Sequence, residues 1–451
     1  MRPIRKNVVS LHLDMLLVHV PRLTNRLGYT LNVLLRHLLK VEFSITTDED
    51  YYLRHGDAKL NYGPRRLGDG LHIKSCNLLF QTSIEEQEPR PFQRDGQWML
   101  FPVYGRDLDL PFDLLAATFF MVSRYEEYLP HREDEHGRFV TQEHLAVQEG
   151  FAEEPVVDQW AALLRKLIAE RYPDFNLPER HYRMVQTVDV DAAWCYLHKG
   201  IFRTTVGLLR DLFHRRDLDQ VRQRLRVLFG REQDPFDSFD YIIELQKQMP
   251  DTHLLFFVLL ADYSHYDKPA SYLNPHSREL VQHLGDHAKI GIHPGYQSVE
   301  QPKNVDKETK RLETILHRTI VRSRYHFLRV RLPLAYRILL RAGLHHDYSM
   351  GYADTPGFRA GITSPFPFYD LERDCETELL VHPFCVMDTT LKRYLALTPE
   401  EGLERYKKLI ASVRKVDGTF CFIVHNQNLS AFDGWQGWRE VYEKMLEIAK
   451  P

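Results

Sequence analysis

The sequence predicts an α/β protein in two parts: about seven βα units that form a parallel sheet or barrel in residues 181–451, and a smaller α/β domain in residues 1–180. The length of 451 residues suits two or three domains of roughly 150 residues each. After residue 183, apolar strand-like runs alternate with long helical patterns, which is typical of βα units. Residues 173–180 (PDFNLPER) contain two prolines and are predicted to connect the two parts.

The pattern in residues 1–180 is less regular. We expect helices where apolar residues recur at spacings of three and four, and strands in short apolar runs. The expected segments are, in order, apolar stretches around residues 8–20 and 29–45, strand-like runs at 71–80 and 98–103, and helices at 112–128 and 156–171. These elements predict a small α/β domain.

The pattern after residue 183 is more regular. The first strand, residues 184–188, is followed by a charge-rich helical insert near residues 202–249. The remaining elements are expected, in order, as strand 254–260, helix 277–284, strand 289–292, helix 307–320, strand 327–330, helix 334–342, strands 346–352 and 379–386, helix 399–416, strand 419–424 and helix 437–449. About seven βα units fit, one fewer than in the standard eight-unit barrel.

The composition excludes several classes of protein. Lysine and arginine total 59 and aspartate and glutamate 62, so a formal charge of −3 leaves no excess of cations for a nucleic-acid-binding face. Hydrophobic residues make up 43% of the chain, which excludes an intrinsically disordered protein. The longest apolar runs, residues 254–261 and 114–122, are far shorter than the roughly 20 residues that span a bilayer.

Cysteine usage and the N-terminus indicate the compartment. The five cysteines are an odd number without CxxC spacing, which argues against a disulfide framework and a cysteine-ligated zinc site. The basic residues Arg2, Arg5 and Lys6 imitate the start of a signal peptide. His12 and Asp14 interrupt the apolar stretch that follows, so we expect a cytoplasmic protein without an integral membrane segment.

Residues suited to catalysis and metal binding gather where the expected strands end, which is where (β/α) barrels carry their chemistry. Asp189 and Asp191 lie one residue apart on an extended chain and therefore point to the same side. His293 and His425 each follow directly after a strand. The segments between these strands add Arg324, His326, Arg329, Arg331, Asp347 and Asp354. Most of the 23 histidines are expected on the surface, so the position of these few predicts the site.

Each of these residues also has an ordinary structural explanation. Aspartates after a strand can cap a helix or form a turn. A single histidine can be a hydrogen-bonded structural residue, and arginines can form surface pairs. Suitable residues at four separate strand ends favour an active site, functional or formerly functional, over these alternatives.

The order of the motifs resembles that of the polysaccharide deacetylases with NodB homology, the fourth family of carbohydrate esterases. The family's first motif, TFDD or TxDxE/D, is similar to residues 187–191 (TVDVD), and its TFF strand to residues 255–257 (LFF). Its second motif, an EIG-type strand followed by HSxxH, is similar to residues 290–293 (IGIH). Its RxP motif resembles residues 331–333 (RLP), and its final strand ending in histidine resembles residues 422–425 (FIVH).

The resemblance covers about residues 183–451 and implies a distorted (β/α) barrel of seven units. The segments 349–354 (SMGYAD), 357–361 (GFRAG) and 382–388 (HPFCVMD) are most similar to a bacterial subgroup. That subgroup has an N-terminal domain of unknown function with a segment like residues 123–128 (SRYEEY). Residues 1–180 are therefore expected to be this accessory domain, and residues 181–451 the deacetylase-like barrel.

The resemblance also implies roles for individual residues. Asp189 is expected to be the catalytic base, Arg331 the residue that orients it, and His425 the catalytic acid. Asp191 and His293 are expected to bind a divalent metal, zinc in the first instance.

Further residues are expected around this centre. Asp347 or Asp354 is expected to support the catalytic histidine, although the sequence does not choose between them. The side chains expected to bind the sugar are Arg324, His326, Arg359 and Tyr296. Packing in the protein core is the alternative role for the aromatic side chain.

One position departs from the family pattern. The second metal histidine should lie four residues after His293, where this chain has Gln297. An amide oxygen is a weak zinc ligand compared with imidazole, thiolate or carboxylate. Three outcomes remain open: Gln297 binds weakly, another residue such as His326 or His382 takes its place, or no metal binds.

These observations predict a hydrolase that removes N- or O-acetyl groups from a sugar or glycan by metal-assisted attack of water. The expected partner is a carbohydrate, and no nucleic acid. Two alternatives remain: a glycan- or metabolite-binding protein that has lost turnover, and a metal-independent hydrolase of the C–N bond in a small amide. Bound metal and released acetate would distinguish them.

Overall fold

The computed structural model describes residues 15–215 and 218–451, which divide into two compact units. Unit 1 comprises Met1–Phe120 and Gln159–Arg180, and unit 2 comprises Met121–Asp158 and His181–Pro451. Residues 121–158, which we assigned to the N-terminal domain from the sequence, are therefore part of unit 2. The basic N-terminal residues and the apolar residues 8–14 lie outside the described part.

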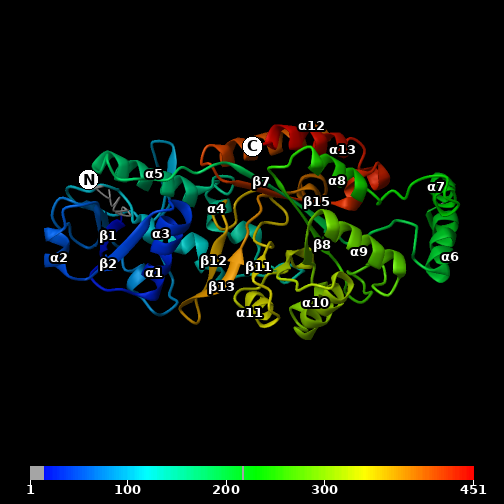
Figure 1. The fold of residues 1–451 in the computed structure, drawn as a ribbon, viewed down its shortest axis with the longest axis horizontal. Helices are drawn as coiled ribbons and strands as arrows, with labels where there is room; N and C mark the ends of the chain where they lie inside the picture. The colour runs from blue at the N-terminus through cyan, green and yellow to red at the C-terminus, as the bar shows by residue number, and fades with distance from the viewer. Residues whose placement is uncertain (1–14, 216–217) are drawn as a thin grey trace, which may run out of the picture. The chain divides into compact units, whose positions relative to one another are not determined.

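Unit 1 is built on a parallel four-stranded sheet with strand order β2-β1-β3-β4 (Figure 1). The strands of unit 1 are β1 (Met15–His19), β2 (Glu42–Thr46), β3 (Lys59–Gly63) and β4 (Leu71–Lys74), with a hairpin of β5 (Phe92–Arg94) and β6 (Gln97–Met99). Its helices are α1 (Asn25–Leu31), followed by a π-helix (Asn32–Leu38), α2 (Glu49–Arg54), and most of α3 (Leu114–Val122) and α5 (Val156–Arg171). The expected α/β character of this part is confirmed.

Strand β3 was not expected from the sequence. Its run KLNYG mixes polar and apolar residues, yet all five are buried. The polar side chains find partners: Asn61 Nδ2 lies 3.1 Å from His19 Nδ1, and the Tyr62 hydroxyl donates to Asp113 at 2.9 Å. Because these hydrogen bonds allow polar side chains to be buried, β3 has no apolar pattern by which the sequence could reveal it.

Unit 2 contains a nine-stranded sheet with strand order β12-β13-β11-β10-β9-β8-β7-β15-β14. The strands of this sheet are β7 (Arg183–Val190), β8 (His253–Val258), β9 (Lys289–Ile292), β10 (Arg322–Ser323), β11 (His346–Asp347), β12 (Phe366–Asp370), β13 (Cys375–Val381), β14 (Val386–Met387) and β15 (Thr419–His425). All neighbours are parallel except β12 and β13. No pairing closes this sheet between β14 and β12 in the described residues, so the expected seven-unit barrel stays a prediction.

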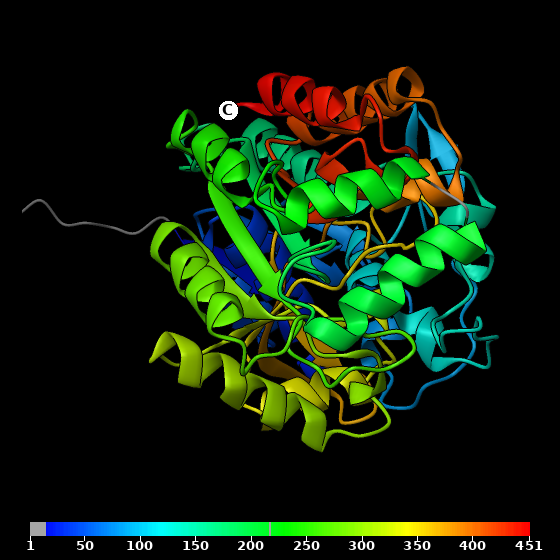
Figure 2. The ribbon, with the colours of Figure 1, turned by 90° about the vertical axis from the view of Figure 1, so that its right-hand side faces the viewer.

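Helices of unit 2 alternate with strands from β7 to β11 and around β15, as the sequence predicts, whereas no α-helix separates β11, β12, β13 and β14. The helices are α4 (Leu145–Gln148), α6 (Ile201–Leu209), α7 (Leu218–Leu228), α8 (Phe239–Lys247), α9 (Pro275–His287), α10 (Lys303–Leu316), α11 (Leu334–Arg341), α12 (Pro399–Arg414) and α13 (Trp438–Ala449). Figure 2 shows α9 and α10 side by side along the strands, and α12 contacts α13. In the part of the chain that the structure describes, no helix is both long and apolar enough to cross a membrane.

Strand register in unit 2 brings the polar strand ends together. Asp189 at the end of β7 is paired with His425 on β15 and with Phe257 on β8. Ile292, which precedes His293, is paired with Val258 on β8 and with Ser323 on β10. Because parallel strands end at the same edge of a sheet, their following residues share one site.

The expected strand at residues 327–330 is wrong. The strand in this region is β10, Arg322–Ser323, and the chain then turns through left-handed conformations at Phe327 (φ 58°) and Leu328 (φ 53°). The Tyr325 N–H donates to Ser349 Oγ at 2.9 Å instead of continuing the ladder. The chain leaves the sheet early, and this places His326 beyond the end of the strand.

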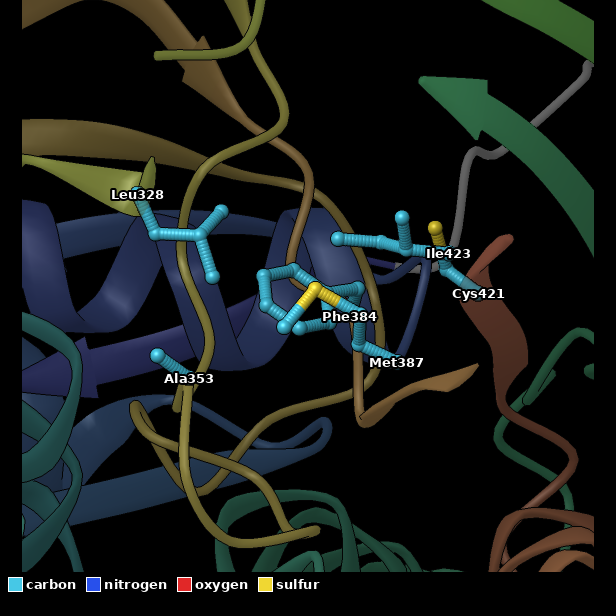
Figure 3. Close-up of a cluster of buried hydrophobic side chains, with 6 residues drawn as sticks. All are labelled: Leu328, Ala353, Phe384, Met387, Cys421 and Ile423. Atoms are coloured by element: carbon cyan, nitrogen blue, oxygen red, sulfur yellow. The ribbon is translucent and has the colours of Figure 1, made fainter. Parts of the chain in front are cut away.

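A cluster of buried apolar side chains lies within unit 2 (Figure 3). Its members are Leu328, Ala353, Phe384, Met387, Cys421 and Ile423. Because Met387 ends β14 and Ile423 lies on β15, the cluster holds these two strands in place. Close packing of this kind fixes the positions of the residues that follow each strand.

A buried ionic cluster connects residues 121–158 to the rest of unit 2. Glu127 accepts hydrogen bonds from Arg359 at 2.7 and 3.0 Å and from Arg124 at 2.8 Å. The three side chains are at most 5% exposed. Burial raises the pKa of Glu127, but Arg359 and Arg124 outweigh it and lower this pKa to about 2. The cluster is therefore ionised at neutral pH.

Replacing Glu127 with glutamine should lower the free energy of unfolding by about 3 kcal/mol, because the buried Arg359 loses its carboxylate partner and the buried Arg124 keeps only Glu126. Urea unfolding followed by circular dichroism measures this change. The matched control is Glu404→Gln, which removes an exposed pair with Lys407 and should leave the midpoint unchanged. The difference in the free energy of unfolding between wild type and Glu127→Gln should reach its full value above about pH 4.5. It should decrease as the pH falls toward 2, because Glu127 then becomes protonated in the folded protein. Equal midpoints for both variants would contradict a stabilising role.

Candidate functional site

Three side chains with metal-binding atoms meet at the C-terminal edge of the large sheet. Asp191 follows β7, His293 follows β9, and His326 lies in the turn after β10. Asp191 Oδ1 lies 3.3 Å from His293 Nε2 and 3.7 Å from His326 Nε2. One ligand atom from each residue lies within 4.8 Å of the other two. A carboxylate and two imidazoles are a ligand set suited to zinc and related divalent metals.

Each histidine of this cluster is oriented through its second ring nitrogen. His293 Nδ1 lies 2.5 Å from the Arg324 carbonyl oxygen, to which it donates. His326 Nδ1 lies 2.7 Å from Asp267, whose carboxylate also accepts the Tyr296 N–H. These contacts leave Nε2 of both rings directed toward Asp191, as in metal sites whose ligands are held by outer hydrogen bonds.

The charges of the cluster fit a bound cation. Asp191 Oδ1 is buried and accepts no hydrogen bond from the described residues. Burial raises the pKa of Asp191, but His326, His293 and His425 hold it well below its ordinary value. Burial lowers the pKa of His326, whereas Asp191 and Asp267 raise it to about 9. The cluster thus favours a positive charge beside an ionised carboxylate, and a metal would satisfy the unpaired oxygen.

Asp189 lies beside this cluster and is held by a buried arginine. Its Oδ1 accepts a hydrogen bond from Arg324 Nη1 at 2.7 Å, and its Oδ2 lies 3.8 Å from His293 Nε2. The same Arg324 nitrogen donates to Thr187 Oγ1 at 2.8 Å, and Nε donates to the Tyr348 carbonyl at 2.9 Å. Asp189 therefore has one oxygen fixed by a cation and a second oxygen next to the cluster.

His425 completes the site. Its Nδ1 lies 2.7 Å from Asp388 Oδ1, and its Nε2 lies 3.8 Å from Asp191 Oδ2. Asp388 also accepts the His425 backbone N–H and an N–H of Asn428, each at 2.9 Å. Burial lowers the pKa of His425, but Asp388, Asp191 and Asp189 raise it to about 10. This imidazole carries a proton that it can donate through Nε2.

The structure brings together four residues expected from the sequence: Asp189, Asp191, His293 and His425. Arg324, expected at the substrate, instead contacts Asp189. His326, expected at the substrate or in place of the missing metal histidine, lies in the candidate metal cluster.

Other expected residues lie away from this centre. Arg331 is 61% exposed and pairs with Glu133 at 3.2 Å, so the guanidinium on Asp189 is that of Arg324. Gln297 is exposed, and its side chain accepts a hydrogen bond from Gln301 at 3.2 Å. His382 stacks on Tyr348 with the ring centroids 4.2 Å apart.

The remaining expected residues have other partners. Asp347 accepts the N–H and the hydroxyl of Ser349, each at 2.8 Å, and burial raises its pKa to about 6. Asp354 accepts the Thr141 hydroxyl at 2.7 Å, and Arg359 binds Glu127. The Tyr296 ring stacks on Tyr266 at 3.9 Å and its hydroxyl lies 3.1 Å from His136 Nδ1.

Two acidic residues of the site were not identified from the sequence. Asp388 orients His425, and it ends the segment HPFCVMD that was noted only as a family resemblance. Asp267 orients His326 and lies in a loop without any recognisable motif. Hydrogen bonding between distant segments carries no local sequence signal.

Comparison with known proteins gives one family model and several solved structures that are similar to part of the chain. The family model described as "Family of unknown function (DUF7033)" matches residues 16–173. A search of curated protein sequences finds no match.

Three solved structures resemble part of the chain at low identity. A protein from Mycobacterium smegmatis described as a polysaccharide deacetylase is 14% identical, with a TM-score of 0.37, over 60% of this chain and 85% of that one. A polysaccharide deacetylase from Bacillus cereus is 10% identical, with a TM-score of 0.28, over 59% and 88% of the two chains. A mutant of a CE4 family pseudoenzyme with restored enzymatic activity is 10% identical, with a TM-score of 0.26, over 59% and 63%.

Proposed function

We propose that the protein is a metal-dependent hydrolase that removes an acyl group, in the first instance acetyl, from a nitrogen or oxygen of a sugar. The observation that carries this proposal is the Asp191–His293–His326 cluster with a carboxylate and a protonated imidazole beside it. Hydrolysis of an amide needs an activated water, a stabilised oxyanion and a proton for the leaving amine. The carbohydrate substrate is inferred from the resemblance of the sequence motifs.

Asp191, His293 and His326 would hold the metal. When bound, a divalent metal lowers the pKa of a water ligand and polarises the acyl carbonyl. The hydrogen bonds to the Arg324 carbonyl and to Asp267 keep both imidazoles in the orientation that this binding requires.

Asp189 is suited to the role of general base. Arg324 Nη1 holds one oxygen by a hydrogen bond, while the second oxygen lies beside the cluster. That second oxygen can take the proton from the attacking water. The buried guanidinium fixes the carboxylate before the reaction, so no reorganisation is needed during proton transfer.

His425 is suited to the role of general acid. Asp388 holds Nδ1–H, so the proton for the leaving nitrogen comes from Nε2. His425 and Asp189 are directly paired on neighbouring strands, and both lie close to Asp191 or His293. We infer that the base and the acid serve opposite ends of the scissile bond.

Acetate release after chelation tests this proposal. Protein loaded with Zn²⁺ or Co²⁺ should release acetate from N-acetylglucosamine oligomers, and removal of the metal should lower the rate at least about 100-fold. Adding back Zn²⁺ should restore the rate, whereas Ca²⁺, which prefers oxygen ligands, should not.

The other outcomes contradict the proposal in different ways. Release that persists after complete metal removal would indicate a metal-independent hydrolase. Bound metal without acetate release from N- or O-acetylated sugars would indicate a binding protein.

A further inference from the structure

A cavity of about 720 Å³ adjoins the metal cluster. Asp191 and His326 line it on one side, so this space continues directly from the reaction centre. The other walls come from the loop after β7, from the insert that contains α6 and α7, and from the loops after β8 and β15. A cavity of this volume is typical of a site for a small molecule.

The lining of the cavity is strongly basic. Five cations face it: Lys199, Arg203, Arg210, Arg224 and Lys268. Asp191, the metal-binding carboxylate, is the one acidic residue among its described lining residues. The surrounding segment, residues 199–232, has nine lysines and arginines against four aspartates and glutamates, although the whole chain has a formal charge of −3.

Among the described residues, four of the five cations have no carboxylate partner. Arg224 binds the buried Asp211 through Nε at 3.0 Å and Nη2 at 2.5 Å, which ties α7 to the π-helix (Arg210–Arg215) that follows α6. In the described part of the chain, the other four form no ion pair. Lys199 is partly buried, and burial lowers its pKa; nearby Arg203 lowers it further. An anion in the cavity would compensate these charges.

Aromatic rings line the same space. Arg203 lies over the ring of Tyr263, 4.5 Å from its centroid. Tyr266 also lines the cavity and stacks on Tyr296. Aromatic faces bind the apolar faces of sugar rings, while arginine binds phosphate and carboxylate through paired hydrogen bonds. The cavity thus combines surfaces for a sugar and for an anionic group.

We propose that this cavity selects substrates in which the acylated sugar carries an anionic group, a phosphate or a carboxylate. This proposal rests on the hydrolase function and adds its substrate class. Arg203 and Arg210 of the insert bind the anion together with Lys199 and Lys268 of the loops after β7 and β8, while the acyl group lies at Asp191 and His326. The insert is then a specificity element added to the sheet.

Steady-state kinetics with matched substrates tests this inference. We expect kcat/KM for N-acetylglucosamine 1-phosphate, its 6-phosphate or N-acetylmuramic acid to exceed that for N-acetylglucosamine at least about tenfold, with the difference in KM. The three anionic probes distinguish the position and the kind of anion. The preference should decrease as the ionic strength rises from 0.05 to about 0.5 M, because salt screens charge.

Two variants locate the effect. Arg203→Ala and Arg210→Ala should each lower the ratio of anionic to neutral kcat/KM at least about fivefold. The matched control is Arg222→Ala on α7, because Arg222 is exposed, pairs with Asp219 and does not line the cavity. It should leave the ratio unchanged.

The outcomes separate this inference from the proposed function. Hydrolysis with equal kcat/KM for neutral and anionic sugars would overturn the anion site and leave the hydrolase standing. If no sugar is hydrolysed, calorimetric binding decides: tighter binding of N-acetylglucosamine 1-phosphate than of N-acetylglucosamine, lost in Arg203→Ala, would retain the anion site. Equal or absent binding of both would overturn it.

Discussion

Replacing Asp189 with asparagine should lower kcat for acyl hydrolysis by about 1,000-fold, because general base catalysis contributes 10²–10⁴-fold. The asparagine side chain has nearly the same shape and its oxygen can still accept the hydrogen bond from Arg324. It cannot take a proton from water. The metal ligands are unchanged, so the variant should retain its metal and its unfolding midpoint.

The matched control for Asp189→Asn is Asp354→Asn. Asp354 lies in the same unit, but its carboxylate accepts the Thr141 hydroxyl and does not contact the cluster. This variant should keep kcat within about twofold of wild type. If Asp189→Asn hydrolyses the substrate at the wild-type rate, another group is the base.

Replacing His326 with alanine should abolish hydrolysis at stoichiometric metal, with a loss of at least about 1,000-fold, because removal of a metal ligand removes both water activation and carbonyl polarisation. Excess Zn²⁺ should restore part of the activity, since Asp191 and His293 remain. Acetate release measured against Zn²⁺ concentration records both effects.

Gln297→Ala is the control for His326→Ala. Gln297 occupies the position at which the family pattern has a histidine, but its side chain is exposed and contacts Gln301. This variant should retain wild-type activity at every Zn²⁺ concentration. A loss of activity in Gln297→Ala that Zn²⁺ reverses would place the third ligand at that residue.

The site residues at the ends of β7, β9 and β15 could be predicted from the sequence. The runs before Asp189 and His425 are apolar and extended, and the parallel register places these two residues side by side. Asp191 and His293 follow from the same rule, because they come directly after β7 and β9. The apolar pattern of a strand and the residue at which it ends depend on neighbouring residues only, so both can be recognised in the sequence.

The sequence offered His326 as one replacement for the missing metal histidine but could not choose it over Gln297 or His382, since the position of His326 depends on a strand of only two residues. β10 is too short to show periodicity, and the apolar run at residues 327–330 imitated a strand that does not form. With the strand placed there, His326 precedes it, at the wrong edge of the sheet. In the structure the strand ends at Ser323, so His326 follows the strand and lies close to Asp191.

The arginine beside Asp189 shows the same limit. Arg324 and Arg331 lie in one segment, and the RLP pattern favoured Arg331. Arg324 is completely buried and donates hydrogen bonds to Asp189, Thr187 and the Tyr348 carbonyl, whereas Arg331 is exposed. Spacing along the chain does not show which guanidinium group faces the interior, because that depends on contacts between distant strands.

The number of metal ions per chain is the most direct test of the proposed centre. Elemental analysis after zinc loading and desalting should give about one zinc per chain for wild type and for Gln297→Ala, and almost none for His326→Ala and His293→Ala. This result would establish Asp191, His293 and His326 as one metal site. Wild-type protein without zinc, or His326→Ala with the full complement, would contradict it.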